Sequence, residues 1–143
     1  IAMKTNRKSR GLRNLNPGNI RRSAVRYKGE RATSSDAEFR QFESIEAGYR
    51  AMFVLLHTYA VKHHLTTLRQ IISRYAPPSE NDTSAYLRRV VAATGLSPDE
   101  PLDTLDRDTM VGVVRAMSEV ENGVKAVESE VEGGWRLFVA DFL

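Results

Sequence analysis

The spacing of hydrophobic residues predicts a mainly helical chain whose first long helix begins at Ile45. From that residue, apolar and aromatic side chains recur at offsets of 4, 7, 8, 11, 14 and 15, which places them on one helical face. Ser44 precedes this run and suits the N-cap position. The same periodicity predicts four further helices: 68–75, a segment between the capping residues 81–83 and Gly95, a segment from Leu105 to Asn122-Gly123, and about 129–142.

The first 44 residues carry turn and strand signals instead. Residues 14–19 combine Asn, Pro and Gly, which favour tight turns. Residues 20–28 and 38–42 predict two short strands that pair in a small β-hairpin. We expect residues 1–12 to be a basic flexible arm, with a cloning scar at Ile1–Met3, and residues 13–143 to form a single domain. The predicted fold class is mainly α (α+β), with about five helices and this hairpin near the N-terminus.

Composition narrows the possible chemistry. The 143 residues include no cysteine, which excludes disulfides, a thiol nucleophile and cysteine-based metal sites. No apolar run approaches the roughly 20 residues that a membrane helix needs, and no P-loop, dinucleotide or HExxH pattern is present. His63 and His64 are adjacent and point to different sides, so they make a poor ligand pair. We therefore expect no metal and no cofactor.

Charge is distributed unevenly along the chain. Residues 1–31 hold ten Lys or Arg and one acid, Glu30, whereas the remainder holds eleven basic and seventeen acidic residues. A basic segment of this kind favours an anionic polymer as partner, either nucleic acid or an anionic cell-wall glycan. The alternative is a solvated basic tail.

Glu121 breaks the pattern of its predicted helix. At 100° per residue from Met110, Val114 lies at about 40°, Met117 at about 340° and Glu121 at about 20°, so this carboxyl falls on the apolar stripe. Loss of solvation would raise its pKa and suit it to donate a proton near neutral pH. The alternative is a carboxylate at a helix end that turns outward to water.

Several segments together resemble a phage and bacterial family of peptidoglycan-cleaving proteins, the lytic transglycosylases and virion structural proteins with a lysozyme-like fold. Tyr27 departs from the pattern, since that family more often has Trp. The segments that carry the resemblance are RGLRNLNPGNIRRS (10–23), YKG (27–29), FRQFESIEAGYRAM (39–52), TTLRQIISRYAPPSENDTSAYLRRV (66–90) and ENG (121–123).

A looser resemblance to bacterial glucosaminidase domains implies where the active site lies. Their turn, hairpin and tyrosine segments occur here in the same order, but the helix that carries their catalytic Glu is missing from the front. VVRAMSEVENG (113–123) looks like that helix, which implies a circularly permuted lysozyme-like fold with Glu121 as catalytic acid. The residues expected to bind substrate are Asn16, Asn19, Tyr75, Asn81 and Tyr86.

A hydrolase would normally need a second carboxylate. Glu46 and Asp82 also fit helix starts, so Glu80 is the reserve candidate. Without a clear second acid, we favour a lytic transglycosylase, in which the same carboxyl acts first as acid and then as base.

The sequence thus predicts an enzyme that cleaves the β-1,4 bond between N-acetylmuramic acid and N-acetylglucosamine. The expected partners are peptidoglycan strands, with virion or secretion-system components or an immunity protein as further possibilities. No signal peptide is visible, so we expect delivery by a phage, or as an antibacterial effector, to the bacterial cell wall or periplasm. The alternatives are a hydrolytic muramidase or glucosaminidase, and a non-catalytic virion or nucleic-acid-binding protein.

Overall fold

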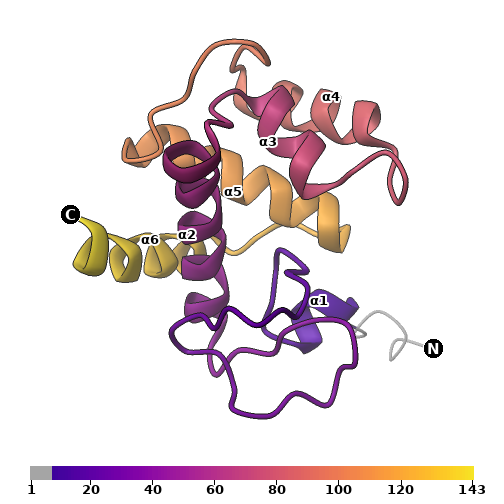
Figure 1. Cartoon of the computed structure of the whole chain (residues 1–143), viewed down its shortest axis with the longest axis vertical. Helices are drawn as coiled ribbons and strands as arrows, with labels where there is room; N and C mark the ends of the chain where they lie inside the picture. The colour runs from indigo at the N-terminus through magenta and orange to yellow at the C-terminus, as the bar shows by residue number, and fades with distance from the viewer. Residues whose placement is uncertain (1–7) are drawn as a thin grey trace.

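The computed structural model describes residues 8–143 and has six helices in that range (Figure 1). The prediction of a mainly α chain is confirmed. Among these residues no helix has the length and hydropathy needed to cross a membrane. The helices are α1 (Arg10–Arg13), α2 (Ile45–His63), α3 (Leu68–Tyr75), α4 (Thr83–Thr94), α5 (Arg107–Asn122) and α6 (Glu128–Phe142).

Local capping explains where the long helices begin and end. The Ser44 hydroxyl accepts a hydrogen bond from Ala47 N at the start of α2, and the Asp82 side chain does the same for α4. Gly95 and Gly123 end α4 and α5 with φ of 72° and 70°, a conformation that glycine adopts without strain. The predicted boundaries of these helices therefore follow from their sequence.

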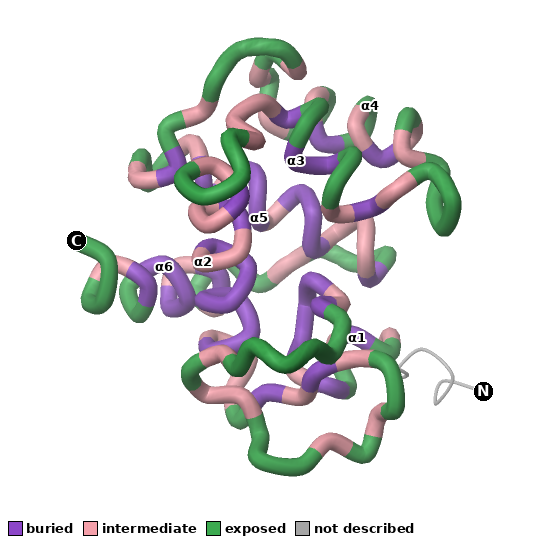
Figure 2. The backbone as a smooth tube through the Cα atoms, viewed as in Figure 1, coloured by how far each residue is buried: buried purple, intermediate pink, exposed green. Residues whose placement is uncertain are grey.

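Helices α2 and α6 cross at close range in the core (Figures 1 and 2). A Cβ at Gly134 would lie 2.4 Å from Tyr49 Cβ and 2.8 Å from Arg50 N, so glycine is required there. Next to this contact the Phe53 ring meets Trp135, with centroids 5.1 Å apart. Glycine at position 134 makes α6 less stable as a helix than alanine would. Because it has no side chain, however, α2 and α6 can approach closely.

The predicted β-hairpin is wrong for the described residues. The segment between α1 and α2 has two isolated antiparallel bridges, Arg21 with Phe39 and Glu30 with Phe42, and no strand. The bridge at Arg21 does not extend into a ladder because Asn16 bonds Ile20 N and Arg40 O, and Asp36 Oδ1 accepts from Glu38 N. The guanidinium of Arg40 donates instead to the carbonyls of Arg21 and Val25. Arg40 is 2% exposed and also pairs with Glu30 at 2.6 Å, so a buried side chain organises this loop.

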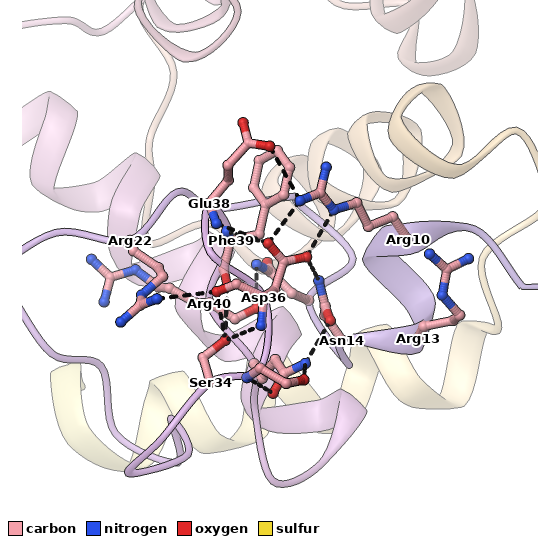
Figure 3. A network of polar contacts seen from close by, with 12 residues as sticks. Arg10, Arg13, Asn14, Arg22, Ser34, Asp36, Glu38, Phe39 and Arg40 are labelled. Carbon is pink, nitrogen blue, oxygen red and sulfur yellow. Dashed lines mark hydrogen bonds and ion pairs between the residues drawn. The ribbon is translucent and has the colours of Figure 1, made fainter.

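The arm expected over residues 1–12 overlaps α1. Ser9 accepts from Leu12 N and caps this short helix, and Arg10 pairs with Asp36 at 2.7 Å. Asn14 donates to the same carboxylate at 3.0 Å (Figure 3). Asp36 thereby ties the loop to α1. The suggested cloning scar at Ile1–Met3 lies outside the described residues.

We predict that Gly134→Ala destabilises the fold by about 1–3 kcal/mol, because the added methyl overpacks the contact with Tyr49. Gly112→Ala in α5 is the matched control. A Cβ there has its nearest neighbour at 3.8 Å, so this change should stabilise by up to about 1 kcal/mol. Urea unfolding measures both, and equal effects of the two substitutions would contradict the proposed packing.

We also predict that Asp36→Asn lowers the melting temperature at pH 7. Arg10 and Asn14 hold the pKa of Asp36 well below its usual range. The ionised Asp36 carboxylate therefore stabilises the folded state at neutral pH, and this stabilisation is lost as the pH falls below about 4. The difference from the parent should therefore shrink in acid. Asp108→Asn is the control, because the Asp108 side chain is 89% exposed in its pair with Arg107. A constant difference from pH 7 to pH 2 would contradict this account.

Candidate active site

A polar hollow of about 330 Å³ opens where the N-terminal segment, α2 and the loop after α3 meet the end of α5. Figure 1 shows the last turn of α5 between the N-terminal segment and the α3–α4 pair. The hollow's walls include Gly18 and Asn19 from the turn, Tyr59 from α2 and Asn81 from the loop after α3. Glu121 is the one carboxylate among its lining residues within 8–143.

Two neutral donors hold the Glu121 carboxyl. The Asn19 amide donates to Oε1 at 2.9 Å, and the Tyr86 hydroxyl donates to Oε2 at 2.9 Å. Asn19 comes from the N-terminal turn and Tyr86 from α4, so three segments distant in sequence meet at one side chain. The carboxyl is partly buried and faces the hollow.

Burial raises the pKa of Glu121 above its ordinary value, and the hydrogen bonds from Asn19 and Tyr86 oppose part of that rise. Burial also raises the pKa values of Tyr75 and Tyr86 well above 10, and the nearby charge of Glu121 adds to both shifts. The two phenols are therefore neutral at physiological pH. Glu121 is suited to gain and lose a proton in this hollow.

The Asn19 amide suits both protonation states of Glu121. Its Oδ1 is buried and has no hydrogen-bond partner among the described residues, while its Nδ2 donates to the carboxylate. An amide carries a donor and an acceptor at opposite corners. Rotation of this amide by half a turn would present Oδ1 to a protonated carboxyl. Asn19 itself adopts a left-handed φ of 48°, which aims its side chain at α5.

The other residues expected to bind substrate occupy different places. Asn16 is fully buried and closes its own turn, since it bonds both the N–H and the C=O of Ile20. Tyr75 lines the hollow, and its hydroxyl donates to Gly18 O, so it anchors the turn. Asn81 is exposed at the rim and donates to Pro77 O. Tyr86 reaches the site only through Glu121.

Glu80, the reserve acid, is half-exposed and pairs with Arg21 at 2.8 Å. It is not among the described residues that line the hollow. The structure therefore brings Asn19, Tyr86 and Glu121 together and leaves Glu80 at the surface.

Sequence reasoning missed Asn122, which docks the turn on α5. Its amide donates to Pro17 O and to Ser118 O, both at 2.8 Å, and its Oδ1 accepts from the Ser9 hydroxyl at 2.6 Å. The only local signal is an Asn directly before the glycine that ends α5. The contact between Asn122 and Pro17 joins residues 105 positions apart, so no local sequence pattern could predict it.

No group of three or more His, Asp or Glu residues in the described part of the chain is placed to hold a metal ion. His57 contacts the Thr104 hydroxyl at 2.8 Å, and His63 and His64 are exposed at the end of α2.

Comparison with known proteins finds a phage relative. Protein P5 of Pseudoalteromonas phage PM2 is 38% identical over 121 residues, which span 82% of this chain and 74% of that protein. No family model matches the chain.

This match overturns the resemblance to the peptidoglycan-cleaving family with a lysozyme-like fold. The relative is a phage protein whose name carries no such activity. The motifs that suggested the resemblance have local duties here: Asn16 closes a turn and Asp82 caps a helix. Such capping and turn residues recur in unrelated folds. The circular permutation inferred from motif order loses its basis as well.

We predict that Glu121→Gln stabilises the protein at pH 7–8 by about 3 °C in melting temperature, which corresponds to about 1 kcal/mol in a domain of this size. The pKa of Glu121 is raised in the folded state, so its ionised form is destabilising there, and this penalty appears as the pH rises through the folded-state pKa. A glutamine can accept from Tyr86 and donate to the unpartnered Asn19 Oδ1.

The stabilisation should disappear near pH 4, where the parent carboxyl is protonated. Exposed Glu100→Gln is the control and should change little at either pH. A loss of stability in Glu121→Gln at pH 7–8 would mean that the hydrogen bonds to the carboxylate outweigh its burial.

Proposed function

This chain belongs to the family of Protein P5 of Pseudoalteromonas phage PM2, and from its pocket we propose that it cleaves glycosidic bonds with Glu121 as general acid. The observation that carries the proposal is the position of Glu121, a partly buried carboxyl held by Asn19 and Tyr86 in the wall of a polar hollow. The proposed substrate is the β-1,4 bond between N-acetylmuramic acid and N-acetylglucosamine in bacterial cell-wall glycan.

The first step needs a protonated carboxyl beside the scissile bond. Glu121 donates its proton to the glycosidic oxygen as the bond from that oxygen to the anomeric carbon breaks. The bonding pair stays on the oxygen, which leaves as a hydroxyl, and positive charge develops on the anomeric carbon. Burial raises the pKa of Glu121, which increases the protonated fraction of this carboxyl at any given pH.

In the second step the Glu121 carboxylate acts as the base. It removes the proton from the muramyl 6-hydroxyl, and that oxygen bonds to the anomeric carbon to close a 1,6-anhydro ring. In hydrolysis a water would take the place of this hydroxyl, normally with a second carboxylate. Glu121 is the one acid among the described lining residues, which favours the intramolecular route.

The hollow also offers groups that suit a sugar. Asn81 at the rim has an amide, while Ser23 and Arg21 add a hydroxyl and a guanidinium. Tyr59 and Phe39 contribute aromatic rings to the wall. A few polar groups set among apolar walls are typical of small-ligand sites.

The phage relative supports a bacterial setting. We propose that the protein acts in the cell wall or periplasm and is delivered by a phage particle, where it would contact other virion components. Similarity to a phage protein supports the phage origin alone. The pocket supports acid catalysis on a sugar strand, and the cell-wall strand is the bacterial glycan that we propose for it.

A non-catalytic phage component is the second candidate function. The comparison taken alone favours it, because the relative is a phage protein with no activity in its name. Arg13, Arg22 and Arg26 are exposed and form no ion pair with any of residues 8–143, so they could contact nucleic-acid phosphates. In that case Glu121 would only fasten α5 to the turn.

Release of soluble fragments from purified peptidoglycan, read by mass spectrometry, tests the proposal. We predict that the parent releases 1,6-anhydro products and that Glu121→Gln lowers the rate about 10²–10⁴-fold, the usual worth of a general acid. Exposed Glu100→Gln should keep the parent rate, and Glu80→Gln should cut activity far less than Glu121→Gln.

Full activity in Glu121→Gln would remove the catalytic assignment. A parent that releases nothing but retains DNA in a salt-dependent way would support the second candidate instead. Reducing ends in place of anhydro ends would keep Glu121 as the acid and replace the intramolecular step by hydrolysis.

A further inference from the structure

A second hollow, of about 500 Å³, adjoins the pocket that contains Glu121. The two hollows share four wall residues and are therefore direct neighbours. These residues are Ser23, Tyr27, Arg40 and Leu55. A strand bound at Glu121 would therefore extend past Tyr27 into the second hollow.

The second hollow is basic. Its described lining includes no Asp or Glu, but it contains five permanently cationic side chains: Arg26, Lys28, Arg40, Arg50 and Lys62. Two carboxylates pair with members of this set from outside the lining. Glu30 binds Arg40, and Asp141 is shared by Arg50 and Lys28. Five cations against two carboxylates leave an excess of three positive charges.

Arg26 and Lys62 place two of these positive charges at the solvent-exposed surface of the hollow. Both are exposed, and neither forms an ion pair within residues 8–143. Arg26 donates only to the backbone carbonyl of Arg31, at 3.0 Å. Lys62 lies in the last turn of α2, so its ammonium is carried by a rigid element. Two cations that line one hollow and have no acidic partner within residues 8–143 are suited to hold an anionic group.

We infer that this basic hollow, defined by Arg26, Lys28, Arg50 and Lys62, binds a muramyl carboxylate on a peptide-free stretch of the same glycan strand that Glu121 cleaves. The inference rests on the proposed function and deepens it, because it names the substrate as an anionic glycan. The concave shape and the shared wall favour a substituent on a thin strand. A DNA duplex presents a charge every 1.7 Å or so along its axis and would bring phosphates against the Glu121 carboxylate.

Binding measured in the Glu121→Gln background separates this inference from catalysis, because the strand stays intact. The probes are peptide-free strands of alternating N-acetylglucosamine and N-acetylmuramic acid, and the same strands with their carboxylates converted to amides. We predict that Arg26→Ala with Lys62→Ala weakens binding of the carboxylated strands about tenfold, as two partly exposed charge contacts would. Binding of the amidated strands should change less than twofold.

Arg136→Ala with Lys125→Ala is the matched control, because both residues are exposed and lie outside the two hollows. It should leave both affinities unchanged. Affinity for the carboxylated strands should also fall with added salt, and affinity for the amidated strands should not.

Equal weakening of both strands by the double substitution, or no weakening of either, would overturn the inference. So would a 20-base-pair DNA duplex that binds more tightly than the strands and is lost in the same variant. Failure of the proposed function would give a different result. If the parent binds carboxylated strands through Arg26 and Lys62 but never cuts them, the carboxylate-binding inference stands and the catalytic proposal is wrong.

Discussion

The contact between the turn at residues 14–20 and the C-terminal end of α5 decides where the chemistry of this protein lies. Asn122, the last residue of α5, donates its amide to Pro17 O. Tyr75, the last residue of α3, donates its hydroxyl to Gly18 O. With the turn fixed at two points, the Asn19 amide is held beside the carboxyl of Glu121 and donates to it. Loss of the Asn122 contact would release the turn and the carboxyl together.

The position of Glu121 lowers the stability of the fold but suits the carboxyl to exchange a proton. The partly buried carboxyl of Glu121 loses hydration, and two neutral donors replace only part of it. A residue chosen for stability alone would be apolar here, like Met117 one turn earlier, which is fully buried. A polar group that lowers the free energy of unfolding in this way is typical of a functional site, where the residue is not chosen for stability. The basic hollow adjoins this pocket and carries charge of the opposite sign.

Helices were predictable because their signals are local. The apolar period from Ile45, the Ser44 cap and the Gly95 and Gly123 ends lie within a few residues of what they determine. Glu121 was found in the same way, from its angle on the helix. The loop between α1 and α2 was not predictable, because the buried guanidinium of Arg40 organises it through contacts 10 to 19 residues away. Nor could spacing separate Asn16, which closes a turn, from Asn19, which faces the site.

Direct titration of the Glu121 carboxyl tests the central claim. Carbon-13 NMR of protein labelled at the glutamate side-chain carboxyl, with the Glu121 signal assigned by its absence in Glu121→Gln, gives the pKa of that one group. The account predicts a midpoint clearly above the ordinary glutamate value of about 4.3. A midpoint at or below that value would show that hydrogen bonds or solvation outweigh burial, and it would contradict the role of Glu121 as a general acid.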